Sequence, residues 1–369
     1  MNKIFWCKNC LNMSTRPRIE FDKNGWCNAC TWVHEKENIN WKKKLEEFKK
    51  LIKKSKNNPA YDCIVPCSGG KDGTYVSNKI KSLGYNPLMV TVRPHLETDI
   101  GKNNLYNFLE TNNVAHHHIT IPYEVMRKFN KLGLIYKGSP YYGWLLGIHT
   151  AVIRLALDMN IGLIIYGEDG ELEYGGTTKN KNKTSYNYEY IKNEMIEGDY
   201  NKILKKSGYN FKETYLLRLP PDSEIKKKKL KFAHWSYFEN WDPYRNYMFA
   251  KKNSNLQEQK VSNVGTFTNF AQNDQALFAL HMYLMYLKFG FGRATQDVGI
   301  EIRRGAMTRS QGINLVKMYD YKYSKDFLKD YLEYYQMKEK ELVKVIDKWV
   351  NKKLFTKTKN GWKPKFQIK

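Results

Sequence analysis

The stretch Tyr61-Asp-Cys-Ile-Val-Pro-Cys-Ser-Gly-Gly-Lys-Asp-Gly-Thr-Tyr75 joins an apolar strand, a glycine turn and the start of a helix. The strand would end at the carboxyl edge of a sheet, and the amides that open the helix would point at an anion. Gly69 and Gly70 carry no side chain that would block a close approach to the backbone. Lys71 adds a positive charge, and Asp72 offers a carboxylate to Mg²⁺. The stretch therefore predicts a phosphate-binding loop.

The spacing of the glycines distinguishes this loop from another phosphate-binding motif. The Gly-x-x-x-x-Gly-Lys-Ser/Thr pattern of kinases and GTPases is absent from the loop. Residues Ser68-Gly-Gly-Lys-Asp72 instead resemble the pyrophosphate loop (PP-loop) of ATP pyrophosphatases. This resemblance implies an enzyme that splits ATP between its α and β phosphates and adenylates an oxygen atom.

Apolar residues around the loop predict an α/β domain. Strands over 61–66 and 88–92 flank a helix over 72–82, and such a βαβ unit implies a parallel sheet with a right-handed crossover. Helices and strands alternate further along the chain, so we expect a doubly wound, mostly parallel sheet. The further elements that we expect are helices near 100–110, 124–131 and 142–159 and strands over 114–121 and 161–166.

Ligands of doubly wound sheets collect at the carboxyl ends of the strands. Three loops should therefore converge at one edge of the sheet. These loops are 67–73, 93–99 and 167–176.

The composition favours a cytoplasmic protein of two or three domains. The chain has 369 residues, and we find neither an apolar signal-peptide core at its start nor an apolar run of the roughly 18 residues that a membrane span needs. The formal net charge of +25 would attract nucleic acid or charged small substrates. Because the basic residues are spread along the chain except at 226–229, we give this charge little weight as a sign of nucleic-acid binding.

Two pairs of cysteines predict a zinc site near the start of the chain. Cys7 and Cys10 form one Cys-x-x-Cys pair, and Cys27 and Cys30 form another. This spacing fits two knuckles that close a tetrahedral Cys₄ site for Zn²⁺. Disulfide pairing is the alternative, but a reducing cytoplasm disfavours it. The bound metal would supply much of the folding free energy of so short a segment.

These patterns divide the chain into three parts. Residues 1–40 form the zinc-binding segment, and a charged helix over 40–56 leads into the α/β domain, residues 41–262. Polar sequence over 177–262 predicts an insertion or a lid within that domain. Residues 263–369 form a helical region, with a helix over 272–289, a capping box at Thr308-x-x-Gln311 and a helical hairpin in the tail.

Several loops together resemble one family, the N-acetyl sugar amidotransferases that act in the biosynthesis of bacterial surface glycans and flagellin sugars. The paired cysteine knuckles also fit this family. The resemblance covers most of the chain outside the 177–262 region and the tail. The matching stretches are Val65-Pro-Cys-Ser-Gly-Gly-Lys-Asp72, Arg93-Pro-His-Leu-Glu-Thr-Asp-Ile-Gly101, Tyr166-Gly-Glu-Asp-Gly-Glu-Leu-Glu-Tyr-Gly175, Gly265-Thr-Phe-Thr-Asn-Phe270, Lys288-Phe-Gly-Phe-Gly-Arg-Ala-Thr295 and Glu301-Ile-Arg-Arg-Gly305.

The resemblance implies a reaction that converts an acetamido group into an acetamidino group. An amide carbonyl is unreactive toward ammonia, because resonance must be lost and oxide is a poor leaving group. Transfer of AMP to the amide oxygen gives an imidate with a good leaving group, and ammonia then attacks the imidate carbon. Pseudaminic and legionaminic acids and lipopolysaccharide sugars are the kinds of substrate that the family implies.

The resemblance also assigns residues to ATP and Mg²⁺. Lys71 would balance the charge of the pyrophosphate, and Asp72 would hold Mg²⁺. The chain departs from many PP-loops at Gly73, where they have Ser, so either Thr74 or backbone amides would replace that hydroxyl. The nucleotide-binding residues implied are Ser68, Gly69, Gly70, Lys71, Asp72, Gly73, Thr74, Val90, Thr91, Val92 and Gly167.

Charged residues in the other loops are candidates for chemistry and for sugar binding. Glu168 and Asp169 should lie at the carboxyl edge of the sheet, and we expect them to be catalytic together with Lys71 and Asp72. The arginines of the carboxyl-terminal helices fit equally well with salt bridges between helices and with binding of a substrate anion. The expected substrate-binding residues are Arg93, His95, Asp99, Glu173, Tyr174, Arg293, Glu301, Arg303 and Arg304.

We find no ammonia-generating unit in the chain. A glutaminase would need a catalytic Cys with a His and a Glu on a second α/β unit, and no such pattern is present. We therefore expect a separate glutaminase subunit, together with a barrel-type subunit that conducts ammonia. A membrane partner is not expected.

Two other functions remain open from the sequence. A tRNA-thiolating PP-loop enzyme would explain the basic charge, the zinc knuckles and Cys67 close to the phosphates. A zinc-organised scaffold with a degenerate nucleotide site would explain Gly73. Against thiolation, we find no RNA-binding module in the sequence.

Overall fold

The computed structural model describes residues 4–359 and 361–368, apart from 197 and 199, and its centre is a five-stranded sheet. The strand order is β3-β2-β1-β4-β5, and every neighbouring pair is parallel. The prediction of a doubly wound, mostly parallel sheet is confirmed. The strands are β1 (Cys63–Pro66), β2 (Pro87–Val92), β3 (Ala115–Ile119), β4 (Leu163–Tyr166) and β5 (Lys231–His234).

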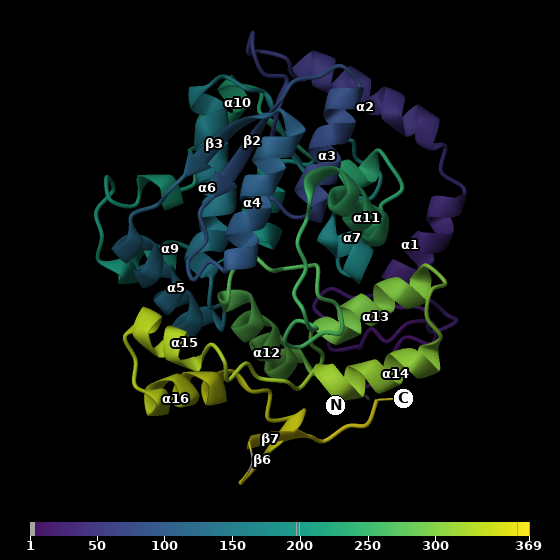
Figure 1. Ribbon diagram of the computed structural model, residues 1–369, viewed down its shortest axis with the longest axis vertical. Coiled ribbons are helices and arrows are strands. Elements are labelled where there is room, and N and C mark those ends of the chain that lie inside the picture. The colour runs from purple at the N-terminus through teal and green to yellow at the C-terminus, as the bar shows by residue number, and fades with distance from the viewer. Residues whose placement is uncertain (1–3, 197, 199, 360, 369) are drawn as a thin grey trace.

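Both faces of the sheet are covered by helices (Figure 1). Successive residues of β1 enter different cores, because side chains alternate across a strand. Ile64 packs in one core with α5 (Tyr123–Lys137) and α6 (Tyr142–Asp158). Val65 packs in the other with α2 (Trp41–Ser55), α3 (Lys71–Ser82) and α4 (Asp99–Asn112).

Region 177–262 completes the sheet as well as covering it. It supplies strand β5, which pairs with β4 in the register Ile164 to Phe232. The sequence patterns did not indicate this strand. The remaining elements of the region are α8 (Tyr188–Tyr190), η1 (Ile191–Met195), α9 (Tyr200–Ser207), η2 (Tyr215–Leu217), α10 (Asp222–Lys227), η3 (Trp235–Tyr237) and α11 (Pro243–Ser254).

The carboxyl-terminal region packs below the sheet domain in Figure 1. The capping box at Thr308 and the helical hairpin of the tail are confirmed. The chain then adds a β-hairpin that the sequence analysis did not predict. The elements are α12 (Leu277–Phe289), α13 (Arg293–Arg303), α14 (Arg309–Tyr319), α15 (Leu328–Tyr335), α16 (Glu339–Trp349), β6 (Phe355–Thr358) and β7 (Gly361–Pro364).

Helix α12 begins five residues later than the pattern over 272–289 predicted. The residues before it are bonded to the 93–99 loop instead of continuing the helix. Thr98 N donates to Asp274 O over 3.1 Å, and Ala276 N donates to Leu96 O over 2.9 Å. These bonds bring a carboxyl-terminal segment to the carboxyl edge of the sheet.

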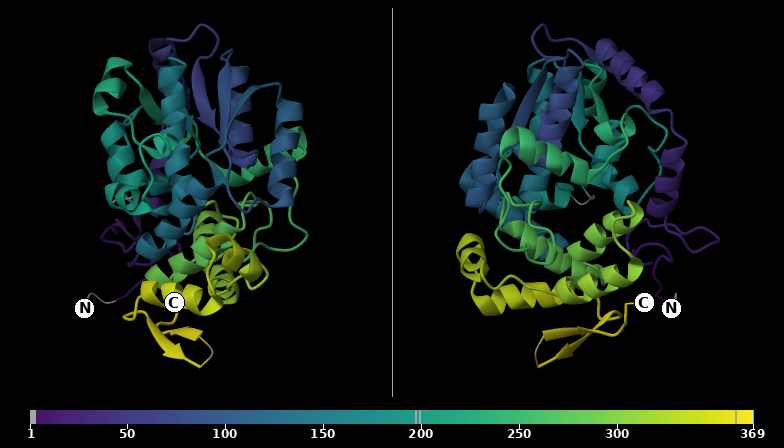
Figure 2. Two further views of the ribbon diagram at one scale, coloured as in Figure 1. Left: turned by 90° about the vertical axis from the view of Figure 1, so that its left-hand side faces the viewer. Right: turned by 45° about the vertical axis from the view of Figure 1, so that its right-hand side comes forward.

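The amino-terminal segment lies against the sheet domain and the carboxyl-terminal helices (Figures 1 and 2). It contains α1 (Asn28–Glu37) and two short antiparallel bridges, Trp6 to Met13 and Phe21 to Cys27. Helix α1 packs near the short helix α7 (Gly170–Tyr174), which follows strand β4. Among the described residues, no helix has the length and apolar character needed to cross a membrane.

Candidate active site

The phosphate-binding loop joins β1 to α3 as the sequence predicted. Gly70 is the N-cap of α3, and no side chain caps this helix end, so its amides face the loop. Gly69 adopts φ +77°, and a Cβ there would lie 2.5 Å from Leu105 N and closer still to Leu105 Cα. Only glycine fits this position, because α4 lies directly against the loop backbone.

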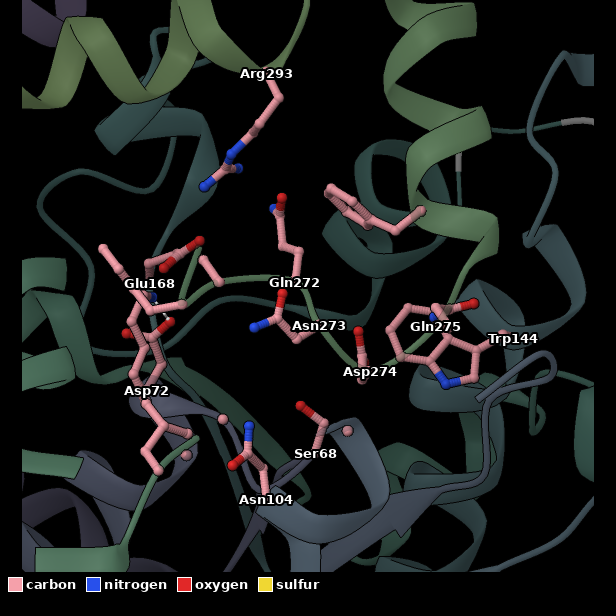
Figure 3. Close-up of a pocket in the computed structure, with 18 of the residues that line it drawn as sticks. Ser68, Asp72, Asn104, Trp144, Glu168, Gln272, Asn273, Asp274, Gln275 and Arg293 are labelled. Carbon is pink, nitrogen blue, oxygen red and sulfur yellow. Dashed lines mark hydrogen bonds and ion pairs between the residues drawn. The ribbon is translucent and has the colours of Figure 1, made fainter. Parts of the chain in front are cut away.

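The loop forms one wall of a cavity of about 240 Å³ (Figure 3). The other walls come from α4, the segment after β4, the 270–275 segment and the start of α13. Figure 3 shows Arg293 reaching in from the side opposite Ser68, with Glu168 and Gln272 between them. The lining residues are Ser68, Gly70, Lys71, Asp72, Gly73, Gly101, Asn104, Trp144, Glu168, Tyr174, Leu256, Phe270, Ala271, Gln272, Asn273, Asp274, Gln275, Phe278 and Arg293.

Two carboxylates meet beside the phosphate loop. Asp72 accepts a hydrogen bond from Asn246 Nδ2 over 2.9 Å and forms an ion pair with Lys71. Tyr174 Oη donates to Glu168 Oε1 over 2.9 Å. Burial raises the pKa of Glu168, and the negative charge of Asp72 raises it further. Two neighbouring carboxylates repel each other unless a cation or a proton lies between them, so Asp72 and Glu168 fit Mg²⁺, which prefers oxygen ligands.

Arg293 supplies buried positive charge on the opposite wall. Its guanidinium pairs with Asp297 over 2.8 Å and lies 5.8 Å from the centre of the Tyr174 ring. Its Nε is buried and has no hydrogen-bond partner. The structure thus places Arg293 in the same cavity as the phosphate loop, which its position in the sequence did not reveal.

Asp169 has a different environment from its neighbour Glu168. It is the N-cap of α7, where its side chain accepts a hydrogen bond from Glu171 N over 3.1 Å. The side chain is buried beside His234 and is not part of the cavity lining described above. Burial raises the pKa of Asp169 to about 7.

This raised pKa predicts a change in stability for Asp169→Asn. The folded state holds the Asp169 proton more tightly than the unfolded chain, so the wild type loses stability as the pH rises from about 4 to about 7. Asn also caps helices, so the variant should avoid this loss and melt at a higher temperature than the wild type at pH 8, with a smaller difference at pH 5. Calorimetry at the two pH values tests this, and an equal difference at both would contradict it.

The residues named in the 93–99 loop lie away from the cavity lining. Arg93 forms an ion pair with Glu97 over 2.7 Å, and Asp99 is exposed in the first turn of α4. His95 is buried and hydrogen-bonded to Tyr334 Oη over 2.8 Å. Burial lowers the pKa of His95 to about 4. Their role in sugar binding stays a prediction.

Strand β2 carries the three residues, Val90 to Val92, that the family resemblance places against the adenine of ATP. Val90 and Val92 are buried, and Thr91 Oγ1 donates to Cys67 O over 2.8 Å. Gly167 lies between β4 and Glu168, where a Cβ would approach the Trp241 ring. These residues stand beside the loop at the carboxyl edge of the sheet, and their contact with adenine stays a prediction.

The remaining predicted residues gather at a second cavity of about 270 Å³. Glu173 pairs there with Lys36 of α1 over 2.6 Å. Arg303 and Arg304 also line this cavity, and Arg304 pairs with Glu301 over 2.8 Å. Tyr174 lines both cavities and so stands between them.

The structure gives a steric reason for glycine at position 73, which the sequence alone did not show. A Cβ at this position would lie 2.8 Å from Cys67 Cβ, which is closer than real Cβ contacts. Thr74 is fully buried, its hydroxyl has no partner, and it is not part of the cavity lining. Residue 73 must therefore be glycine as long as residue 67 carries a side chain in this position. Thr74 does not present its hydroxyl to the cavity.

The sequence analysis missed one wall of the cavity and one residue that positions Asp72. The segment Gln272–Gln275 and Asn104 give the cavity a wall rich in amides, and Asn246 positions Asp72 from α11. No motif marks these residues, because they converge only through tertiary contacts. The matched stretch Gly265–Phe270 was the one sequence signal near these residues, and its last residue, Phe270, itself lines the cavity.

The four amino-terminal cysteines have the arrangement of a metal site. All four are buried, and their sulfur atoms lie within 4.8 Å of one another. Three sulfur pairs are 3.6–3.7 Å apart, near the ~3.8 Å edge of a tetrahedron with Zn–S bonds of about 2.3 Å. A disulfide would bring two sulfurs to about 2.05 Å. Cys27 N also donates to Cys7 Sγ over 3.1 Å. The thiol set therefore fits Zn²⁺.

A comparison with protein families matches residues 264–368 to the family described as "LPS biosynthesis protein WbpG-like, C-terminal domain". No curated protein matches the chain. Among solved structures, the chain is similar to a predicted subunit of tRNA methyltransferase from Methanocaldococcus jannaschii, with 12% identity, a TM-score of 0.29 and coverage of 60% of this chain and 85% of that one.

A second similar structure is NMN synthetase from Francisella tularensis, with 11% identity, a TM-score of 0.28 and coverage of 61% of this chain and 100% of that one. TM-scores this low support no argument about the fold or the function of the chain. The family match covers the part of the chain that supplies Arg293 and the amide wall to the cavity. In agreement with the family that the motifs of the chain resemble, residues 264–368 are similar to the C-terminal domain of WbpG-like LPS biosynthesis proteins.

Proposed function

We propose that the protein is an ATP-dependent amidotransferase of glycan biosynthesis. It adenylates the acetamido oxygen of an N-acetyl sugar and replaces that oxygen with nitrogen from ammonia. One observation carries the proposal. An uncapped helix N-terminus with Lys71 faces a cavity that also holds a carboxylate pair and the WbpG-like domain's Arg293.

The geometry suits transfer of AMP. The α3 amides and Lys71 would bind the pyrophosphate, and Asp72 and Glu168 would hold Mg²⁺, which neutralises phosphate charge when bound. Lys71 pairs with Asp72 in the structure and would turn to the phosphates when they arrive. Arg293 lies where it can stabilise negative charge on the transferred group.

Glu168 is held in position by Tyr174, whose hydroxyl donates a hydrogen bond to Glu168 Oε1 over 2.9 Å. This bond would keep the Glu168 carboxylate beside Asp72, where the two side chains would orient Mg²⁺ toward the phosphates.

The test is a coupled assay for AMP and pyrophosphate with ammonium as the nitrogen source. Supplying ammonium directly removes the need for the proposed glutaminase and conduit subunits. AMP should form only when an N-acetyl sugar is present, and mass spectrometry should show replacement of oxygen by NH in that sugar. The matched control is the same sugar with a free amine in place of the acetamido group. AMP formation that is equal with both sugars would contradict the proposal.

Thiolation is disfavoured by the position of Cys67. A sulfur relay needs an accessible thiolate, and Cys67 packs with the core beneath the loop and is not part of the cavity lining. Burial raises the pKa of Cys67 to about 11, so the thiol stays protonated near neutral pH.

Cys67→Ser therefore separates the two chemistries. Serine keeps the Cβ and nearly the same size, so the variant should fold and should retain AMP formation within about threefold of the wild type, because no step uses the sulfur. The assay above measures this. Complete loss of turnover in a variant that melts at the wild-type temperature would favour a thiol relay.

A further inference from the structure

The carboxyl end of α7 is held by side chains from the cysteine segment. Four consecutive backbone carbonyls, from residues 173 to 176, each accept a hydrogen bond from a side chain, and three of the donors belong to the first 28 residues. The bonds are Arg303 Nη2 to Glu173 O (2.9 Å), Asn12 Nδ2 to Tyr174 O (2.9 Å), Arg16 Nε to Gly175 O (2.6 Å) and Asn28 Nδ2 to Gly176 O.

Helix α7 depends on these bonds. It has five residues, which is too few for a helix to be stable by itself in water. Gly175 ends it at φ +89°, and the last carbonyls of a helix have no partner within the helix. A Cβ at Gly175 would lie 3.0 Å from Asn12 Nδ2 and 3.1 Å from Asn28 Oδ1, so the two segments are in close contact.

The same donors are tied to the cysteines. Asn12 is 3% exposed, and its Nδ2 also donates to Cys27 Sγ over 3.3 Å. Asn28 directly follows Cys27 and begins α1. Arg303 Nη1 is buried without a partner, and the charge of Arg303 interacts with Cys10, Cys27 and Cys30. A metal bound by the four thiolates would therefore fix the groups that hold α7.

Helix α7 carries Tyr174 into the active-site cavity. The backbone carbonyl of Tyr174 is bonded to Asn12, and its hydroxyl is bonded to Glu168. One residue thus connects the cysteine segment to the carboxylate pair.

We propose that the Cys₄ segment is a clamp that positions Tyr174, with Asn12 as the positioning residue. Loaded with zinc, the segment holds Asn12 against the end of α7, and Tyr174 is thereby held against Glu168. Without zinc the clamp opens and the 171–177 segment loosens, while the sheet stays folded. The clamp itself does not depend on the proposed reaction; only its effect on turnover rests on that function.

The primary test is hydrogen exchange of the backbone amides of residues 171–177 in zinc-saturated protein. Asn12→Ala should speed this exchange by about tenfold, the effect expected for loss of one or two buried hydrogen bonds, with no change in strands β1 and β2. Lys23→Ala is the matched control, because Lys23 is exposed in the same segment. Unchanged exchange in Asn12→Ala that still holds one zinc per chain would overturn the clamp.

Removal of zinc from the wild type gives a second test that needs no variant. A chelator should raise exchange over 171–177 to the level seen in Asn12→Ala, while the amides of the sheet stay protected. Exchange over 171–177 that does not change after zinc has been removed would overturn the proposal. So would a general loss of protection that includes β1 and β2, since the segment would then support the whole fold.

The split between kcat and KM supplies a readout of positioning. Asn12 holds the backbone of Tyr174, and the Tyr174 hydroxyl is hydrogen-bonded to Glu168. Asn12→Ala should therefore lower kcat for AMP formation by about fivefold and leave KM for ATP within about twofold of the wild type, whereas Lys23→Ala should change neither constant. An unchanged kcat in Asn12→Ala would contradict the link to Glu168. Inactivity of every form, wild type included, would instead contradict the proposed function and leave the exchange results to decide the clamp.

Discussion

Asp72→Asn should lower the rate of AMP formation by about a hundredfold to a thousandfold. The substitution removes the charge that would hold Mg²⁺ and leaves Glu168 without a neighbouring carboxylate. The fold should be unaffected, because an Asn side-chain oxygen can still accept the hydrogen bond from Asn246. The measurement is the steady-state rate of AMP release at saturating ATP, together with the melting temperature.

A matched control separates charge at the site from charge elsewhere. Asp158→Asn makes the same change at the exposed end of α6, where no catalytic group lies. This variant should turn over at the wild-type rate. Undiminished turnover in Asp72→Asn would remove Asp72 from the metal-binding role, and equal losses in both variants would point to a general effect of charge.

Gly69→Ala should both destabilise the protein and abolish ATP binding. Alanine at φ +77° costs about 1 kcal/mol, and its Cβ would overlap the backbone of α4 at Leu105. Overpacking of this kind costs about 1–3 kcal/mol more, and the loop or the helix must move to relieve it. Urea unfolding measures the stability, and calorimetric titration with ATP measures the binding.

Gly84→Ala is the control for backbone strain alone. Gly84 has φ +84°, and nothing lies within 4 Å of the position that its Cβ would take. The Gly84→Ala variant should lose about 1 kcal/mol of stability and keep its affinity for ATP. If the two variants are destabilised equally, the close packing of α4 against the phosphate loop has no energetic consequence.

Local patterns in the sequence were enough to predict the sheet, the phosphate loop and the cysteine site. Strand β1 and helix α3 are encoded by adjacent residues, and the cysteine pairs are set by their spacing. The cavity was predictable only on the side formed by the strand ends. Its amide wall comes from residues 272–275, which reach the site through hydrogen bonds to the 93–99 loop.

Glu168 and Asp169 show what cannot be inferred from the position of a residue at the end of a strand. Glu168 and Asp169 follow the same strand, yet one faces the cavity and the other caps α7. A strand end does not determine which of two neighbours turns inward. The capping role had a signal in the sequence, since Asp169 directly precedes the helical stretch Gly-Glu-Leu-Glu-Tyr174.

The strand that region 177–262 contributes restricts how the protein can be shortened or recombined. Excision of the region would leave β4 as an unpaired edge whose apolar residues Leu163 and Ile165 are now fully buried. Exposed edges of this kind pair with other chains and lead to aggregation. The excision would also remove Asn246 from Asp72. A relative could therefore exchange this region only as a cassette that brings its own edge strand and its own partner for Asp72.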